Sequence, residues 1–261
     1  MCLMRVLAIA NQKGGVGKTT TTVNLGAAFA ALGHSTVVVD LDPQTNLTTS
    51  LDLRIEEDGL SLYDVLVDGE PFGEAVLSTT TPDLAACPAD PSLAGADLDI
   101  AREEPDPRRR AIRLRDSLSL WAEGTPPCSF VLLDCPPSLG LLTVNALVAA
   151  DAVIVPMQCE FFAMEGLARL VDTITRVRSA WNPSLHLLGV CFTMVDRRTN
   201  LARQVIAEVR RELGSQVFST LVPRSVRVAE APSFGLPVRD YDPSGQGTAA
   251  YTSLAREILA R

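Results

Sequence analysis

The chain has 261 residues, 47% of them hydrophobic and 21% charged, which is typical of a globular protein with a sizeable buried core. No apolar run approaches the roughly 18 residues of a membrane-spanning helix, and the first residues lack a signal-peptide pattern, so we expect a cytoplasmic protein. The net charge of −8 argues against nucleic-acid binding over the whole surface, although a local basic patch is compatible with it.

Short apolar runs alternate with longer amphipathic stretches, which predicts an α/β fold: a mostly parallel twisted sheet with helices on both faces. The expected strands are rich in Val, Ile and Leu, as strands buried on both faces are. They cover Val6–Ala10, Ser35–Asp40, Leu84–Ala86, Phe130–Asp134, Ala152–Pro156 and Leu187–Thr193. The expected helices cover Thr19–Leu32, Arg108–Ala122, Ser138–Ala149, Met164–Ala180, Leu201–Leu213 and Ala249–Ala260.

The stretch 52–106 is rich in Pro, Asp and Gly turn signals, and we expect it to pack as an irregular flank. The chain shows no internal repeat, low-complexity tail or clear linker. We therefore expect one domain over residues 1–261.

The first expected strand runs directly into a glycine-rich loop, and a helix follows, which is the context that a phosphate-binding loop requires. In such a loop, glycines allow successive backbone N–H groups to point at an anion, and the helix N-terminus adds its positive end. We expect Lys18 to reach the β- and γ-phosphates of ATP or ADP, and the Thr19 hydroxyl to ligate Mg²⁺. The loop is Lys13-Gly14-Gly15-Val16-Gly17-Lys18-Thr19-Thr20.

Lysine usage supports this interpretation. The chain contains 21 arginines but only two lysines, Lys13 and Lys18, and both lie in this loop. A compact ammonium group approaches phosphate oxygens more closely than a guanidinium group does.

Three aspartates lie at or just after the ends of expected strands. Asp40 and Asp42 are two residues apart at the end of the second strand, so their side chains point the same way. At the carboxyl edge of a parallel sheet they would lie beside the phosphate loop. Asp134 ends the strand Phe130–Asp134 before two prolines, and such an aspartate commonly holds Mg²⁺ through water.

Gln12 stands where the usual phosphate loop has glycine, and Lys13 is an additional lysine. With these features the chain resembles the deviant Walker A ATPases of the ParA/Soj chromosome- and plasmid-partitioning family, which are related to MinD. The resemblance implies that Lys13 reaches the partner's nucleotide across an ATP-closed homodimer. It also implies that Asp40 lies near the Mg²⁺ shell and that Asp42 positions the attacking water.

A C-terminal segment extends the resemblance. Residues 223–235 are similar to a segment of Soj-type proteins, and the start of that segment contacts the adenine base. The sequence here is Pro-Arg-Ser-Val-Arg-Val-Ala-Glu-Ala-Pro-Ser-Phe-Gly. This similarity implies base contacts for Pro223 and Ser225, although the family usually has Asn in place of Ser225. A ParB-type partner, which stimulates hydrolysis, is also implied by the resemblance.

Residues 196–227 contain seven arginines and only three acidic residues within an acidic chain. Such a segment is either a solvated helix face or a local site for nucleic acid. By resemblance, Arg198 and Arg227 bind duplex DNA without sequence specificity on the nucleoid, and we expect Arg224, which lies between them in sequence, to bind DNA with them. Five more arginines, which could supplement this patch, are Arg108, Arg109, Arg110, Arg113 and Arg115.

Three alternatives belong to the same superfamily. A MinD-like membrane-cycling regulator needs a basic amphipathic C-terminal helix, and the chain shows none, so we expect no membrane partner. An iron–sulfur carrier needs a C-x-x-C pair or a bridging cysteine, whereas the pattern here predicts free buried thiols. A ParA-like protein that positions another cargo is the third. The six cysteines are Cys2, Cys87, Cys128, Cys135, Cys159 and Cys191.

Overall fold

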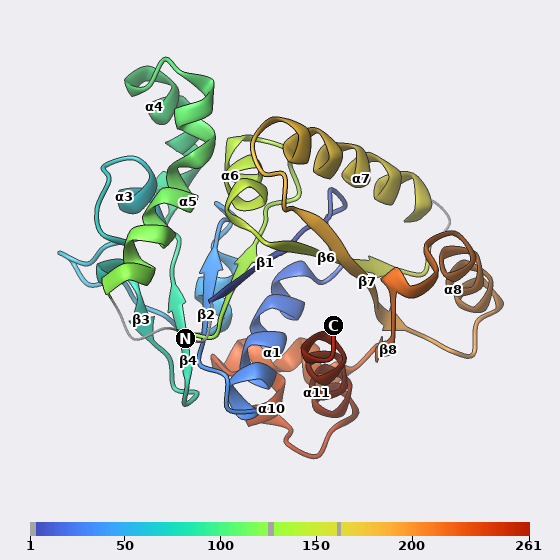
Figure 1. Ribbon diagram of the computed structural model, residues 1–261. Coiled ribbons are helices and arrows are strands. Elements are labelled where there is room, and N and C mark those ends of the chain that lie inside the picture. Colours follow the sequence, from blue (N-terminus) through green and yellow to red (C-terminus); the bar gives the residue numbers. More distant parts are fainter. Residues whose placement is uncertain (1–3, 125–127, 161–162) are drawn as a thin grey trace.

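The computed structural model describes residues 4–124, 128–160 and 163–261. Its centre is an eight-stranded sheet of order β3-β4-β2-β5-β1-β6-β7-β8, in which all neighbouring strands are parallel except β3 and β4 (Figure 1). This sheet confirms the predicted α/β class. The strands are β1 (Arg5–Ile9), β2 (Thr36–Asp40), β3 (Leu77–Ser78), β4 (Leu84–Cys87), β5 (Phe130–Asp134), β6 (Ala152–Gln158), β7 (His186–Val195) and β8 (Val217–Pro223).

Helices cover both faces of the sheet (Figure 1). Helices α3 to α8 pack on one face around one apolar core, and α1, α2, α10 and α11 pack on the other around a second core. Within the described residues, no helix is long and apolar enough to cross a membrane. The helices are α1 (Lys18–Ala31), α2 (Asn46–Ser50), α3 (Leu62–Leu66), α4 (Ala96–Glu103), α5 (Pro107–Gly124), α6 (Leu141–Ala149), α7 (Ala163–Ala180), α8 (Asn200–Leu213), α9 (Val226–Glu230), α10 (Val238–Tyr241) and α11 (Gln246–Leu259). Short 3₁₀ helices are η1 (Phe72–Ala75), η2 (Pro91–Gly95), η3 (Gly214–Gln216) and η4 (Ala231–Phe234).

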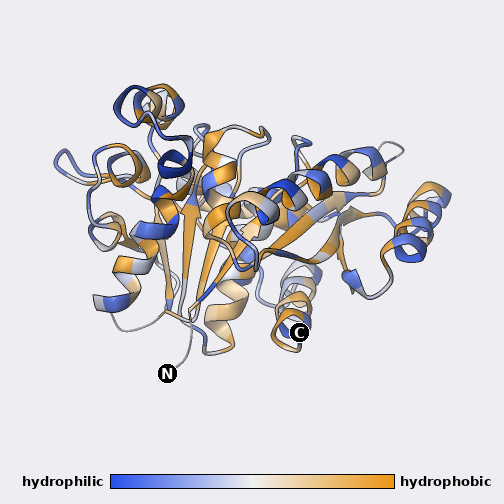
Figure 2. Ribbon diagram, turned by 45° about the horizontal axis from the view of Figure 1, so that its top comes forward, coloured by the Kyte–Doolittle hydropathy of each residue, from blue (hydrophilic) through white to orange (hydrophobic). Residues whose placement is uncertain are grey.

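The central strands are buried on both faces, which explains their continuous apolar pattern. Figure 2 shows hydrophobic residues along these strands and hydrophilic residues on the outer turns of the flanking helices. Every residue of β2 and β5 is buried, including the terminal Asp40 and Asp134. The parallel register aligns the ends of β1, β2 and β5, so that Ile9, Asp134 and Asp40 form one row at the carboxyl edge of the sheet.

Several elements differ from the expectation. The stretch 52–106 is not irregular, because it contains α3, α4, the edge strand β3 and two 3₁₀ helices; each is too short to give a clear sequence period. The sequence pattern also does not predict β8, because Ser219 and Thr220 interrupt its apolar run. The backbone N–H groups of these two residues donate to the Glu257 carboxylate of α11 at 2.6 and 3.1 Å.

Two helices begin at residues other than those expected. The helix expected from Ser138 begins at Leu141, after the two prolines, and the helix expected from Ala249 begins earlier, at Gln246. The short helices α2, α9 and α10 have no counterpart among the expected elements. Each has only four or five residues, which is too few for an amphipathic period.

The cysteines within the described residues are free thiols, as expected. Four of them are buried, and Cys159 is partly buried. Burial raises the pKa of the Cys128 and Cys159 thiols to about 11, which keeps both protonated at neutral pH. Cys2 lies outside the described residues.

Helix α1 lies directly on the sheet because of Gly26. A Cβ atom at Gly26 would lie 2.8 Å from Cγ1 of Val38 and 3.1 Å from Cδ1 of Leu84. Both neighbours are core side chains, and Val38 cannot move aside because its branched Cβ is fixed on β2. The glycine therefore allows the helix that begins at the phosphate loop to pack closely on the strands that carry the aspartates.

We expect Gly26→Ala to lower the free energy of unfolding by about 1–2 kcal/mol, because overpacking outweighs the gain in helix propensity. Gly166→Ala in α7 is the matched control. Nothing lies within 4 Å of a Cβ at Gly166, and this substitution should raise stability by roughly 0.5–1 kcal/mol. Urea unfolding of the nucleotide-free protein measures both changes. Equal effects of the two substitutions would contradict the close approach of α1.

Candidate functional site

The glycine-rich loop joins β1 to α1 at the row of strand ends. Gly15 and Gly17 have φ angles of 74° and 85°, in the left-handed region that favours glycine. A Cβ atom at Gly14 or Gly15 would meet nothing within 4 Å, so the space in front of the loop is open. Thr19 and Thr20 follow in the first turn of α1, where backbone N–H groups point toward that space. This geometry suits an anion such as a phosphate group.

Neighbouring strands hold the loop in place. The Asn11 side chain donates to the Pro156 carbonyl at 2.7 Å and accepts from the Lys13 N–H at 3.0 Å. The Thr193 hydroxyl donates to the carbonyl of the buried Val16 at 2.7 Å, and Gln158 Nε2 donates to the Gly15 carbonyl at 2.6 Å. The loop is thus fixed from β6 and β7 before any ligand binds.

Lys18 lies beneath the loop. Its side chain is 7% exposed, and its Nζ donates to the Lys13 carbonyl at 3.4 Å. Burial lowers the pKa of its ammonium group, while the nearby Asp134, Cys135 and Asp42 act in the opposite direction. A bound phosphate would supply further negative charge and would stabilise the charged lysine.

Asp134 is fully buried at the end of β5. Its Oδ1 accepts a hydrogen bond from the Thr22 hydroxyl at 3.3 Å, whereas its Oδ2 is buried without a partner. Burial, with the charge of Asp40 on the adjacent strand, raises the pKa of Asp134 to about 8, while the nearby Thr19 hydroxyl and the Lys18 ammonium act against this shift. An unpartnered carboxylate oxygen beside a threonine hydroxyl fits a hard cation such as Mg²⁺.

Asp40 is also fully buried, but both of its oxygens have partners. Its Oδ2 accepts from the N–H and the hydroxyl of Thr48 at 3.0 and 2.7 Å, and its Oδ1 accepts from the Asp42 N–H at 3.2 Å. Burial raises the pKa of Asp40 to about 6, although these hydrogen bonds act to lower it. Asp42 is 8% exposed, and its Oδ1 accepts from the Gln44 N–H at 3.0 Å.

The ammonium groups of Lys13 and Lys18 have different partners, although both residues belong to the same loop. The Lys13 ammonium group forms an ion pair with the Glu160 carboxylate that follows β6, and both side chains are about half exposed. The sequence pattern gave no indication of this pair, because 147 residues separate its members.

A small cavity of about 160 Å³ opens beside the loop. The expected base-contacting residues Pro223 and Ser225 line it together with Gly17, Thr20 and the buried Tyr251. The Ser225 hydroxyl also accepts from the Val228 N–H at 3.4 Å, which caps α9. A largely apolar cavity next to a phosphate-binding loop suits a planar base.

Two of the predicted DNA-binding arginines lie around a second hollow, and one of them, Arg224, also lines the small cavity beside the loop. Arg198 and Arg224 line a hollow of about 760 Å³ with Asp196 and Gln246. Arg198 forms an ion pair with Asp196 at 2.7 Å, which lowers the pKa of that carboxyl group to about 2. Arg227 lies outside the residues that line this hollow and pairs with Glu230 at 3.2 Å. The two arginines named by the resemblance are therefore exposed but already paired.

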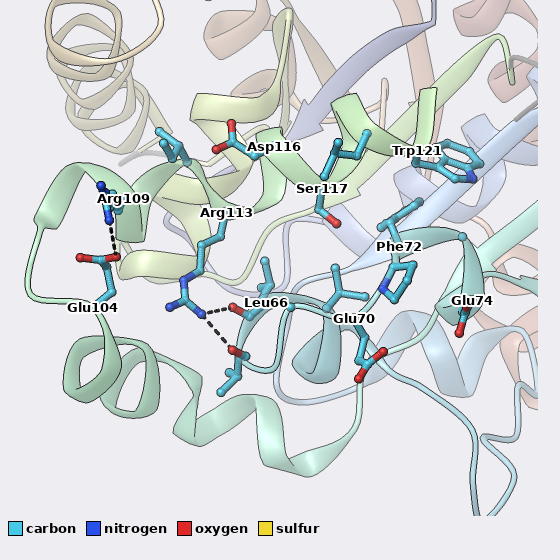
Figure 3. A pocket seen from close by; sticks show the side chains of 17 residues that line it. Leu66, Glu70, Phe72, Glu74, Glu104, Arg109, Arg113, Asp116, Ser117 and Trp121 are labelled. Carbon is cyan, nitrogen blue, oxygen red and sulfur yellow. Dashed lines mark hydrogen bonds and ion pairs between the residues drawn. The ribbon is translucent and has the colours of Figure 1, made fainter. Parts of the chain in front are cut away.

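The arginines of α5 do not join this surface, contrary to the expectation that they could supplement it. Helix α5 lies toward the β3 and β4 edge of the sheet, whereas α8 lies toward the opposite edge (Figure 1). Arg113 donates to the carbonyl groups of Leu66 and Val67 at the end of α3, and Arg109 pairs with Glu104 (Figure 3). These two line a hollow of about 870 Å³ between α5 and the segment 65–74.

Comparison with known proteins identifies close relatives of this arrangement. A family model described as an AAA domain matches residues 4–187. The chromosome partitioning protein ParA of Caulobacter vibrioides is 51% identical over 259 residues, which cover 99% of this chain and 95% of that protein. The sporulation initiation inhibitor protein Soj of Bacillus subtilis is 43% identical over 98% of both chains.

A solved structure is also similar over nearly the whole chain. It is described as cobyrinic acid a,c-diamide synthase from Mycobacterium smegmatis with bound ATP analog and magnesium. Its sequence is 36% identical, its TM-score is 0.84, and the match covers 98% of this chain and 94% of that one.

The raised pKa of Asp134 makes stability depend on pH in the metal-free protein. The folded-state pKa is about 8 and the unfolded value about 3.9, so the folded state binds the proton more tightly. The resulting stabilisation is complete below the unfolded pKa and is lost as pH rises through the folded pKa. Relative to Asp134→Asn, the wild-type free energy of unfolding should fall by up to about 1.4 kcal/mol per pH unit between pH 5 and 7.

Urea unfolding in the presence of a chelator measures this difference at several pH values. Asp151→Asn is a control, because the Asp151 carboxylate accepts from the Val6 N–H near the opposite end of the sheet. A difference between wild type and Asp134→Asn that does not change with pH would show that Asp134 is ionised throughout.

Proposed function

Because the chain belongs to the ParA/Soj family of chromosome-partitioning ATPases, we propose that it couples ATP hydrolysis to DNA partitioning. As a single ATPase domain over residues 1–261, it closes into a homodimer on ATP, binds duplex DNA on the nucleoid in the cytoplasm, and hydrolyses ATP when a ParB-type partner engages it. The observation that carries the proposal is the open phosphate loop beside the unpartnered Oδ2 of Asp134.

The nucleotide binds along the loop. Backbone N–H groups of the loop and the Lys18 ammonium hold the phosphates, and the small cavity beside Pro223 and Ser225 takes the adenine base. Thr19 and Asp134 hold Mg²⁺, which neutralises charge on the phosphates during transfer. Because the two oxygens of Asp40 already accept three hydrogen bonds, we assign Asp40 to the surroundings of the ion, as a fixed negative charge rather than a direct ligand.

Hydrolysis requires a positioned water molecule more than a strong base, because phosphoryl transfer depends on alignment and charge neutralisation. Asp42 is the residue that we assign to this task. Its backbone is fixed to Asp40, and its Oδ1 is held by the Gln44 N–H, which leaves Oδ2 without a partner among the described residues.

Dimerisation gives Lys13 its role. In the described chain its ammonium group pairs with Glu160, so it does not neutralise the phosphates of its own subunit. Reaching a second nucleotide across a dimer interface would replace one exposed carboxylate by several phosphate oxygens. An exposed ion pair contributes only about 0.2–1 kcal/mol, so the exchange is energetically accessible.

The similarity to cobyrinic acid a,c-diamide synthase suggests a second candidate function, ATP-dependent amide formation. The partitioning function is favoured, because the relatives named as chromosome partitioning protein ParA are 51% identical in Caulobacter vibrioides and 43% identical in Myxococcus xanthus, against 36% for the solved synthase. An assay of ATP turnover with and without duplex DNA and a ParB-type protein tests the proposal. Turnover that responds to a carboxylic acid substrate instead would favour the second candidate.

The two lysines of the loop should separate binding from assembly. Lys18→Ala should abolish ATP binding, because the phosphates lose their buried counter-charge. Lys13→Ala should change the ATP dissociation constant by no more than about twofold, since its group makes no contact with the loop's own anion site, but it should prevent ATP-dependent dimerisation.

Fluorescent-nucleotide titration and light scattering measure these two properties. Glu160→Gln is the matched control, because it frees Lys13 and should leave the dimer intact. A Lys13→Ala protein that dimerises like wild type would remove Lys13 from the interface.

The basic surface should bind DNA only in the ATP-bound dimer, because dimerisation doubles a weak patch on an otherwise acidic chain. Replacing Arg198 or Arg227 by Ala should weaken binding to all duplex sequences to the same extent. It should flatten the slope of log affinity against log salt by roughly two units per dimer, because each subunit then neutralises one DNA phosphate fewer.

A salt titration of DNA binding in the Asp42→Ala background, which should hydrolyse slowly, measures this slope. Arg102→Ala is the matched control, because Arg102 is exposed and paired with Asp99 on α4, toward the opposite edge of the sheet. An unchanged slope after replacement of both Arg198 and Arg227 would place the DNA surface elsewhere.

A further inference from the structure

Thr48 lies at the centre of a buried chain of hydrogen bonds behind the aspartates. It belongs to the short helix α2 and is 8% exposed. Its hydroxyl donates to Asp40 Oδ2 at 2.7 Å, and its backbone N–H donates to the same oxygen at 3.0 Å. The hydroxyl oxygen also accepts from the Ala89 N–H at 3.0 Å. One side chain thus joins three segments that are distant in sequence: the end of β2, helix α2 and the loop after β4.

The chain continues from Asp40 to Asp42. Asp40 Oδ1 accepts from the Asp42 N–H at 3.2 Å, and Asp42 Oδ1 in turn accepts from the Gln44 N–H at 3.0 Å. The position of the Asp40 carboxylate therefore sets the backbone at Asp42. Thr48 supplies two of the three hydrogen bonds that fix this carboxylate.

Packing alone does not require a threonine at this position. Valine has nearly the same shape and would fill the same volume, but it would leave the Ala89 N–H without its acceptor and Asp40 Oδ2 without one donor. An unsatisfied buried polar group is costly, and a hydrogen bond to an ionised carboxylate is among the stronger ones. The surrounding residues therefore require the hydroxyl group of Thr48 for hydrogen bonding.

We propose that Thr48 is a positioning residue for ATP hydrolysis: it fixes the Asp40 carboxylate and, through it, the backbone that carries Asp42. Thr48 touches neither the phosphate loop nor Asp134 through any hydrogen bond between described residues, so it acts through Asp40. The inference rests on the proposed role of Asp42 in orienting the attacking water. A water molecule misplaced by a small shift of Asp42 would slow the chemical step and would leave ATP binding unaffected.

The test compares Thr48→Val with Thr48→Ser. Thr48→Val should lower kcat for ATP by about tenfold or more, with KM and the ATP dissociation constant within about twofold of wild type, because the missing hydrogen bond acts on the chemical step. Thr48→Ser keeps the hydroxyl and should keep at least about half of the wild-type kcat.

Thr81→Val is the matched control. Thr81 is 2% exposed, and its hydroxyl donates to the Asp240 carboxylate at 2.6 Å, away from the phosphate loop. It should lower stability but leave kcat unchanged. Hydrogen exchange of the Asp42 amide, measured relative to amides of the central strands that exchange by global unfolding, provides a readout that stability alone does not move. This relative rate should rise in Thr48→Val and not in Thr81→Val.

Each outcome decides the proposal. Equal loss of kcat in Thr48→Val and Thr81→Val, or loss of kcat in Thr48→Ser, would overturn it. If Thr48→Val does not fold, Thr48→Ser decides the proposal. A wild-type kcat and a wild-type exchange rate of the Asp42 amide in Thr48→Ser support the proposal, and a lowered kcat in Thr48→Ser contradicts it. Asp42→Ala distinguishes failure of this inference from failure of the proposed role of Asp42. Wild-type turnover in Asp42→Ala would contradict the proposed role of Asp42. Slow turnover in Asp42→Ala together with wild-type turnover in Thr48→Val would contradict only the role of Thr48.

Discussion

The structure depends most on a buried set of ionisable groups at the carboxyl edge of the sheet. Asp40 and Asp134 are register partners on adjacent strands, both fully buried, and Lys18 is a buried ammonium group next to them. Two carboxylates so close in a medium of low polarity repel one another, which adds to burial in raising the pKa of Asp134. Such an arrangement is unfavourable unless a cation and phosphate groups complete it. Under the proposed function, binding of a magnesium nucleotide would relieve this electrostatic cost and so favour binding.

The rest of the fold keeps this set in register. Parallel strands bring the ends of β1, β2 and β5 into one row, and Gly26 allows α1 to pack directly on those strands. The loop is held from β6 and β7 through the Gln158 and Thr193 side chains. Asp40 and Asp134, which look alike in sequence, thereby differ in their hydrogen bonding: both oxygens of Asp40 accept hydrogen bonds from Thr48 or Asp42, whereas Asp134 keeps one unpartnered oxygen.

Local pattern was sufficient to predict much of this. The loop from Lys13 to Thr20 is recognisable because glycine, lysine and threonine spacing is dictated by the geometry around an anion. The central strands are recognisable because burial on both faces requires continuous apolar runs. The pair of Lys13 with Glu160 and the chain from Ala89 through Thr48 to Asp40 were not predictable, since they join residues far apart in sequence and leave no periodic signal. β8 was hidden by the polar residues whose N–H groups bind Glu257.

The raised pKa of Asp134 predicts that its carboxyl group holds a proton when the site is empty, and as a proposed Mg²⁺ ligand it would release that proton when the magnesium nucleotide binds. Calorimetry of Mg²⁺-ATP binding at pH 7, repeated in buffers of different ionisation enthalpy, counts the protons released. We expect release of about one proton per site by the wild-type protein, because the pKa of Asp134 is about 8 and a ligated carboxylate must be ionised. The release should be absent from Asp134→Asn. Equal proton release by both proteins, or none by either, would contradict this role of Asp134.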